Sequence, residues 1–259
     1  MMALRSLAGC GVLLLLAHSV ALAIDHDNLD EGRPLRIEDP YPIAAGESAV
    51  EAGAGVAVPN RARAHAVLPV EILSGFAPNA QLGIGTTILS DPKKDAEQRR
   101  SGDLRVSALY NFNQETLAIP ALGLRLSATV PTGTDSSGTE IRIKGLMTKS
   151  VGRWSFHFNP AYEFITDVPP DQRSSRYEFA LGASYPVGAP RYTRLTVLAD
   201  LFTLQSLRAA DPNRAGAEAG FRYQWTPWTV LDVGLGTEFL GRSAERTAFF
   251  MTAGLSVGF

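Results

Sequence analysis

The sequence predicts an all-β protein: a closed antiparallel transmembrane β-barrel of the outer-membrane type, with about 12 strands. Three observations predict it. They are an N-terminal export signal, a two-residue alternation of apolar and polar side chains that recurs along the chain, and connections of unequal length between the alternating segments. A period of two indicates strands, because successive side chains of a strand point to opposite faces.

Residues 1–23 have the features of a secretory signal peptide. Arg5 precedes an apolar run at 12–17, and the small residues of 21–23 form a cleavage site. The run is too short to span a membrane as a helix. We therefore expect export across the inner membrane and a mature chain that begins at Ile24.

The single cysteine of the chain, Cys10, lies in this signal. Residues 7–10 resemble a lipoprotein box, but the apolar core follows the cysteine where it should precede it, which argues against lipidation. The mature chain then has no cysteine, so neither a disulfide nor a thiolate metal site is expected. The 24 basic and 26 acidic residues give no net positive charge for binding nucleic acid.

Residues 24–46 are acidic, contain Pro34, Pro40 and Pro42, and lack a sustained period. Such a segment does not readily join a sheet. We expect an irregular periplasmic N-terminal arm, either extended or tucked into the mouth of the barrel formed by residues 47–259.

The alternation continues from Glu47 in segments of 11 to 14 residues, the spacing typical of barrel strands. The predicted strands are 47–58, 64–76, 80–90, 102–112, 121–131, 139–149, 153–165, 175–186, 191–203, 214–225, 228–240 and 246–259.

The stretch 153–164 shows the two faces most clearly. Aromatic side chains dominate its even positions, from Trp154 to Phe164, whereas His157 and Glu163 stand at odd positions. A soluble β-sandwich could also contain such a strand. However, a charge facing lipid at the bilayer midplane costs about 2–4 kcal/mol, and the predicted strands from residue 80 onward carry essentially no charge on their apolar face. This favours the barrel.

The connections support the same conclusion. Those at 77–79, 150–152 and 226–227 are short, whereas those at 91–101, 166–174 and 204–213 are longer and polar. Short periplasmic turns that alternate with longer outer loops are typical of outer-membrane barrels.

The polar face of the predicted strands carries charges of both signs, and we expect it to line the lumen. The candidate lumen-lining residues are Glu71, Asp103, Arg105, Arg125, Arg142, His157, Glu163, Arg176, Glu178, Arg194, Arg222, Asp232 and Glu238. Two interpretations remain open: the charges pair across strands and hold the wall together, or they line a pathway and set its ion preference. Mixed signs predict a weak cation preference at most.

No catalytic, cofactor or metal site is expected. Ser155, His157 and Asn159 share one face and invite comparison with a barrel lipid hydrolase, but two residues along a strand span about 6.8 Å, too far for direct hydrogen bonds. The remaining histidines of the mature chain, His26 and His65, lack the spacing of metal ligands.

The chain resembles the outer-membrane family named for the meta-pathway of phenol degradation. The resemblance rests on short motifs: Arg33-Pro34-Leu35 with Asp39, Pro69-Val70-Glu71 with Gly75, Asn79-Ala80-Gln81-Leu82, Leu126 to Gly133, and the closing Gly254 to Phe259. It implies a barrel that passes small compounds, aromatic or apolar ones among them, and it supplies no catalytic residue. It also implies that the C-terminal Phe259 is recognised by the barrel assembly machinery.

We therefore expect a monomeric barrel in the bacterial outer membrane. It would contact outer-membrane lipid and let small-molecule solutes diffuse passively. The alternative is a non-conducting barrel with a structural or adhesive role.

Overall fold

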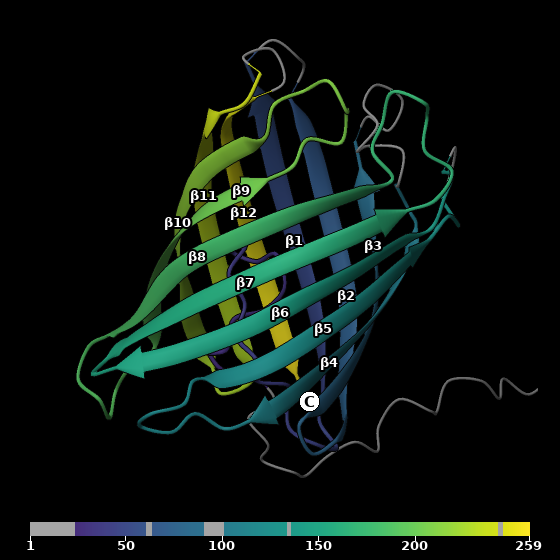
Figure 1. Ribbon diagram of the computed structural model, residues 1–259. Helices are drawn as coiled ribbons and strands as arrows, with labels where there is room; N and C mark the ends of the chain where they lie inside the picture. The colour runs from purple at the N-terminus through teal and green to yellow at the C-terminus, as the bar shows by residue number, and fades with distance from the viewer. Residues whose placement is uncertain (1–23, 61–63, 91–100, 134–135, 243–245) are drawn as a thin grey trace, which may run out of the picture.

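The computed structural model describes residues 24–60, 64–90, 101–133, 136–242 and 246–259. The predicted signal peptide, with Cys10, lies outside them. Twelve strands form one closed barrel (Figure 1). They are β1 (Ser48–Pro59), β2 (His65–Ala77), β3 (Ala80–Leu89), β4 (Leu104–Asn113), β5 (Ala121–Val130), β6 (Glu140–Val151), β7 (Trp154–Ile165), β8 (Ser175–Val187), β9 (Leu195–Leu204), β10 (Arg214–Thr226), β11 (Thr229–Leu240) and β12 (Thr247–Gly258). The described part of the chain contains no helix long and apolar enough to cross a membrane.

Each strand pairs antiparallel with its neighbours in sequence, and β12 closes the barrel against β1. This seam runs in register from Ala49, opposite Gly258, to Val58, opposite Phe249. Closure leaves no free strand edge, which would otherwise expose unpaired backbone groups to lipid. The predicted fold class is confirmed.

The start of β9 differs most from the prediction. It begins at Leu195 instead of residue 191, because the preceding residues form a turn. Pro190 has no amide hydrogen to donate to a neighbouring strand, and the amide of Tyr192 donates to the carbonyl of Ala189.

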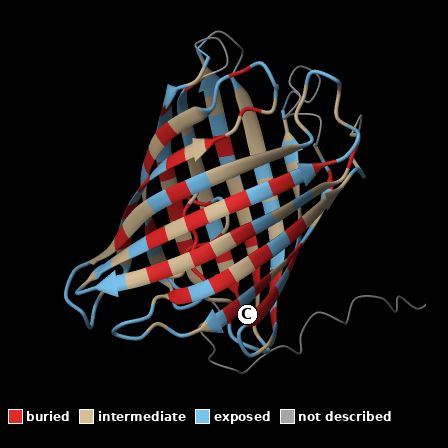
Figure 2. Cartoon of the chain, viewed as in Figure 1, coloured by how far each residue is buried: buried red, intermediate tan, exposed pale blue. Residues whose placement is uncertain are grey.

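The two faces of the strands follow the predicted alternation, which Figure 2 shows as bands along each strand. In β7, Trp154 and Phe164 are exposed on the outside, whereas His157, Asn159 and Glu163 are buried inside. An outer surface of exposed apolar side chains is stable only against lipid.

The C-terminus, the first described residue, Ile24, and the tightest turns lie at one end of the barrel, here called the terminal end (Figure 1). Asn79 and Gly152 adopt positive φ angles of 64° in the turns after β2 and β6. Tight turns favour such residues because they tolerate this conformation. The connections 114–120 and 188–194 at the same end are longer, so loop length alternates less strictly than predicted.

The N-terminal arm, residues 24–46, runs inside the barrel, where it appears as the purple trace behind the front strands of Figure 1. Leu29, Leu35 and Ile37 are almost fully buried and pack with inward side chains of β8 and β9, including Leu198 and Phe202. Of the two arrangements that the sequence left open, the structure has the arm inside the barrel.

The outward face predicts a clear mutational effect. Leu126→Arg, in the middle of β5, should lower the free energy of unfolding in lipid by about 2–4 kcal/mol, because it places a charge against hydrocarbon. Leu117→Arg is the matched control, since Leu117 is fully exposed on the β4–β5 connection. Denaturant titration in liposomes measures both. Equal stability of the two variants would contradict a lipid-facing β5.

Candidate functional site: the lumen and its N-terminal arm

The arm enters and leaves the barrel at the terminal end. Ile24 and Ile43 meet in one apolar cluster with Ala49, Leu73 and Val230. Midway, the amide of Leu29 donates to the Asp39 carboxylate (2.7 Å), and the amide of Asp39 donates to the Leu29 carbonyl (3.4 Å). The arm is therefore a re-entrant segment whose two limbs are joined by hydrogen bonds between Leu29 and Asp39. Arg36 lies in the loop between these two residues.

Inward-facing glycines let the arm approach the wall. A Cβ at Gly234 of β11 would lie 2.3 Å from the Pro34 carbonyl oxygen, and one at Gly75 of β2 would lie 2.1 Å from the Ala44 carbonyl oxygen. No side chain fits at these distances. The wall thus has room for the backbone of the arm only because these side chains are absent.

A first ion cluster joins the arm to β5 and β6. Glu38, which is fully buried, accepts from the Arg125 guanidinium at 2.5 Å and from Lys144 Nζ at 2.9 Å. Glu31 lies 3.3 Å from Arg105 and 3.8 Å from Arg125. The arm thus supplies the carboxylates that neutralise three cations of the wall.

A second cluster lies against β1, β10 and β11. Arg222 Nη1 lies 2.6 Å from the Asp30 carboxylate. Arg33 of the arm lies 2.8 Å from Glu51 and 3.5 Å from Asp232. All five side chains are buried, and each of these ion pairs joins a residue of the arm to a residue of the wall.

A third cluster centres on Arg36. Its guanidinium lies 3.2 Å from Glu178 and 3.1 Å from Glu218, and it stacks over the Phe202 ring at 4.1 Å from the centroid. The amides of Arg36 and Ile37 both donate to the Asp200 carboxylate. These contacts fix the arm across the lumen towards β8, β9 and β10.

The arm's own acids respond to this environment. Burial raises the pKa of Glu31, but the cations of Arg105 and Arg125 outweigh burial and bring the pKa down to about 2. Burial raises the pKa of Asp39 to about 8, despite the hydrogen bonds from the Leu29 and Tyr41 amides. The wall cations therefore favour the ionised form of Glu31, whereas burial favours the protonated form of Asp39.

Five cavities lie along the lumen, on two sides of the arm. Arg36 lines three of them, of about 230, 180 and 450 Å³. Asp25 lines two others, of about 450 and 220 Å³, at the terminal end. None of the five is lined by both residues, so the two groups of cavities adjoin different parts of the arm.

Of the predicted lumen-lining residues, five contact the arm directly: Arg105, Arg125, Glu178, Arg222 and Asp232. Three others form a chain of ion pairs within the wall. Arg142 bridges Glu178 (2.9 Å) and Glu163 (3.9 Å), and Arg176 lies 2.6 Å from Glu163.

The remaining five lie apart from the arm clusters. Asp103 precedes β4 and accepts hydrogen bonds from Gly133 and Ser136. Glu238 pairs with Arg214 at 2.5 Å. Glu71 accepts from Ser107 at 2.9 Å, and His157 is buried between Thr148 and Ser184. Arg194, predicted on a strand, is exposed in the β8–β9 connection, because β9 begins one residue later.

Sequence analysis missed the apolar part of the lumen. Leu198 and Phe202 of β9 point inward, and Phe250 of β12 packs against the same cluster. The signal was present in 191–203, where Leu198 and Phe202 share the parity of Asp200. Apolar side chains on the polar face of a barrel strand indicate a partner inside the lumen, which here is the arm.

The three residues that suggested a hydrolase each form hydrogen bonds with other residues. The Ser155 hydroxyl lies 3.2 Å from that of Ser150, and both ring nitrogens of His157 bond to hydroxyls of neighbouring strands. Asn159 binds the backbone of Glu38, through its amide nitrogen and oxygen. Its role is to hold the arm.

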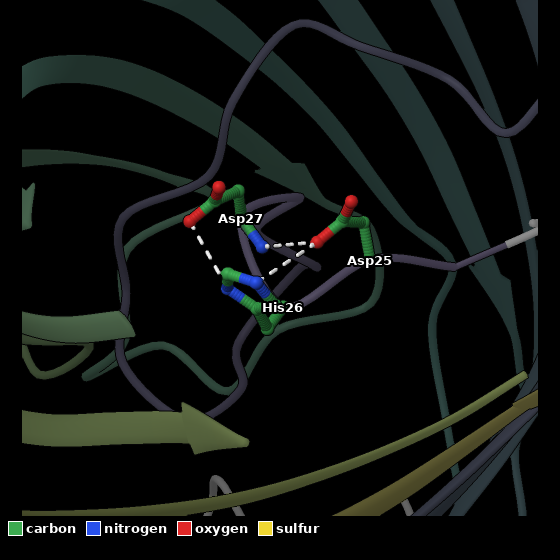
Figure 3. Close-up of side chains that lie close together, drawn as sticks. All are labelled: Asp25, His26 and Asp27. Carbon is green, nitrogen blue, oxygen red and sulfur yellow. Dashed lines mark hydrogen bonds and ion pairs between the residues drawn. The ribbon is translucent and has the colours of Figure 1, made fainter. Parts of the chain in front are cut away.

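The tip of the arm, Asp25 to Asp27, sits at the terminal mouth of the lumen. Figure 3 shows the His26 ring between two carboxylates, with Asp27 3.1 Å from Nδ1 and Asp25 3.6 Å from Nε2. Burial lowers the pKa of His26, but Asp27 and Asp25 outweigh burial and raise it. Nδ1 also lies 2.8 Å from the Thr196 hydroxyl, so the tip is anchored to β9.

Comparison with known proteins identifies the same architecture elsewhere. The model of the family described as "Putative MetA-pathway of phenol degradation" matches residues 33–255. The COG4313 outer-membrane channel from Pseudomonas putida F1 is similar in structure, with a TM-score of 0.63, 14% identity, and coverage of 90% of this chain and 100% of that one. Among curated proteins no relative matches the sequence.

Two porins share the fold as well. The NanC porin has a TM-score of 0.57 at 8% identity, covering 80% of this chain and 98% of its own. The KdgM porin, solved in complex with disordered oligogalacturonate, has a TM-score of 0.57 at 12% identity, covering 82% and 99%.

The ion clusters predict how the arm is held. Glu38→Gln should loosen the arm, because removing one partner of a buried pair costs about 3–5 kcal/mol and leaves Arg125 and Lys144 without their shared carboxylate. Hydrogen exchange should then accelerate at the amides of Glu38 and Ile43, while the strands stay protected. Asp171→Asn is the control, because Asp171 and Arg208 are both exposed and 4.0 Å apart. Unchanged protection of the arm in Glu38→Gln would contradict the prediction.

Proposed function

This protein belongs to the family of the MetA-pathway of phenol degradation and lies in the bacterial outer membrane, and on that premise we propose that it is a channel through which small solutes diffuse passively. The terminal end would face the periplasm, and the arm would set the width of the path.

One observation carries the proposal: the arm lies among the cavities of the lumen, and apart from its covalent link to β1 it is held to the wall by non-covalent contacts. An eight-stranded barrel is filled by its own side chains, whereas a barrel of 12 strands has room for more. Here the additional space is taken by a segment that is joined to the wall by ion pairs and hydrogen bonds. Small displacements of that segment would join the cavities on its two sides.

The solute class follows from the lining. The 450 Å³ cavity on the far side of the arm is lined by Val67, Phe250 and Arg36 among others, a mixture of apolar and charged groups. That volume accommodates a single-ring compound. Together with the family assignment, this supports small aromatic or apolar solutes.

A second function remains supported by a specific observation. The arm pairs with the wall through three buried ion clusters, an arrangement that would also suit a permanently closed barrel with a structural role. The two proposals differ in whether solutes cross the protein.

Flux through the purified protein in liposomes separates them. We expect small ions and a phenol-like compound to enter protein-containing vesicles faster than they enter empty ones. In the protein-containing vesicles, a disaccharide should enter more slowly than either of them. Absence of entry for every compound, with the barrel shown to be folded by heat-modifiable gel mobility, would favour the closed barrel.

Displacing the arm should widen the path. Gly234→Leu introduces a side chain where the Pro34 carbonyl lies only 2.3 Å from an added Cβ, so the arm must move, and single-channel conductance should rise several-fold. Deleting residues 24–46 should raise it further. Ala128→Leu is the control, because it adds bulk to the outward face of β5. Conductance equal to that of the unmodified protein in both arm variants would rule out the arm as the constriction.

The charges predict a weak preference for cations. The arm adds six acidic residues, of which burial favours the neutral form of one, Asp39, and two arginines to a lumen of mixed charge, and an excess of one charge excludes ions of the same sign. Reversal potentials in a KCl gradient should show K⁺ permeating faster than Cl⁻, and the preference should weaken when the arm is deleted. A strong preference for Cl⁻ would contradict this assignment.

We further propose that the protein is a monomer without catalytic activity and that the assembly machinery recognises Phe259. That residue supports the role by its position: its side chain is 62% exposed on the barrel, while its backbone is held by Ser48 through two hydrogen bonds.

A further inference from the structure

The tip of the arm has a feature that transport does not explain. The predicted signal cleavage after Ala23 would make Ile24 the first residue, and His26 would then be third. A histidine in third position brings four nitrogens within reach of one ion: the α-amine of Ile24, the amides of Asp25 and His26, and imidazole Nδ1.

Covalent connectivity alone makes this set a good ligand. The amine and the two amides are consecutive along the backbone and close two five-membered chelate rings, and Nδ1 closes a six-membered third ring. Four nitrogens in one plane suit Cu(II), and Ni(II) less strongly, and Cu(II) heads the affinity order of divalent first-row ions. Binding displaces the two amide protons and the proton of the α-ammonium group, so it releases protons.

The side chains of Asp25, His26 and Asp27 do not form an equally good site by themselves. Asp27 lies 3.1 Å from Nδ1, whereas Asp25 lies 3.6 Å from Nε2, on the other edge of the ring (Figure 3). One ion cannot bind the same ring nitrogen together with both carboxylates unless the tip moves. The carboxylates instead give the tip a negative charge that attracts cations.

Metal ions can reach the tip. The Asp25 side chain is 57% exposed and the Asp27 side chain 54%. Cavities of about 450 and 220 Å³ adjoin Asp25 at the terminal mouth. Ile24 and His26 themselves are only 2% and 5% exposed, and Ile24 packs against Ile43, so the four nitrogens become available together only when the tip leaves the wall.

Two of the four ligand atoms are in use while the tip is docked. The His26 amide donates to the Gln224 side chain at 2.9 Å, and Nδ1 lies 2.8 Å from the Thr196 hydroxyl. We propose that the mature N-terminus Ile24-Asp25-His26 is a Cu(II) site and that metal binding and docking of the tip exclude each other. Copper would thereby free the tip from β9 and β10.

The test uses the full mature protein in detergent at neutral pH, with its N-terminus established by mass spectrometry. Titration with Cu(II) should reach one equivalent, release protons, and give the visible absorption of a square-planar four-nitrogen complex. A mature N-terminus other than Ile24, or the absence of that absorption, overturns the proposal.

Two variants identify the ligands. His26→Ala should abolish the complex. Inserting one glycine between Ala23 and Ile24 keeps every side chain but moves the histidine to fourth position, so it should abolish the complex as well once the inserted glycine is shown to be the first residue. A complex that persists in the insertion variant would mean that the side chains bind the ion, and it would overturn the N-terminal chelate.

A third variant tests the competition. Thr196→Val removes the hydroxyl that holds Nδ1 and should tighten Cu(II) binding by about 2- to 10-fold, the equivalent of one net hydrogen bond. Thr203→Val, on the same strand but bonded to the Arg214 carbonyl, should leave it unchanged. Equal affinity in Thr196→Val and the unmodified protein would refute the coupling to docking.

Discussion

Burying charge in the lumen is the constraint on which this structure depends. Arg125 and Arg222 are almost inaccessible to solvent, and an isolated buried cation costs several kcal/mol. Their carboxylate partners, Glu38 and Asp30, both come from the arm. The arm therefore supplies a close ion-pair partner for each of these two wall cations, and the wall in turn supplies carboxylates to Arg33 and Arg36 of the arm.

This mutual dependence bears on transport. If all charges of the lumen were paired within the wall, an inserted segment would add little electrostatic stabilisation. An uncharged arm, in contrast, would remove the carboxylates of Glu38 and Asp30 from Arg125 and Arg222. The wall also contains ion pairs to which the arm contributes no side chain, Arg142–Glu163 and Arg176–Glu163. In the proposed displacement of the arm these pairs would stay within the wall, while water would solvate the charges that the arm leaves behind.

The strands were largely predictable from the sequence because their pattern is local. Lipid excludes charge from one face, and strand geometry forces that exclusion into every second position, so the faces of β4 and β7 follow from reading the residues in order. The start of β9 was mistaken by four residues, since a turn around Pro190 interrupts a segment that still alternates. Its parity was nevertheless sufficient to place Asp200 and Phe202 on the inner face.

The candidate site was predictable only in part. Inward charges such as Arg125 and Glu178 could be named from parity, but their partners could not, because parity says which way a side chain points and not what it meets. For the same reason the sequence did not indicate that Phe202, an aromatic residue on a polar face, packs against the arm. For an outward residue such as Phe259, which is exposed, parity is sufficient, because a side chain on that face of the barrel has no partner within the lumen to identify.

A barrel of 12 strands, its inner and outer faces and an arm that is not a strand could all be read from the order of the residues, because each depends on the chemistry of sequence neighbours. The folded barrel was needed to show that the arm returns through the lumen and that Arg36 lines three of its cavities. The pairs Glu38–Arg125 and Asp30–Arg222 join residues 87 and 192 positions apart, and such distant partners meet only because the closed barrel brings them to one place.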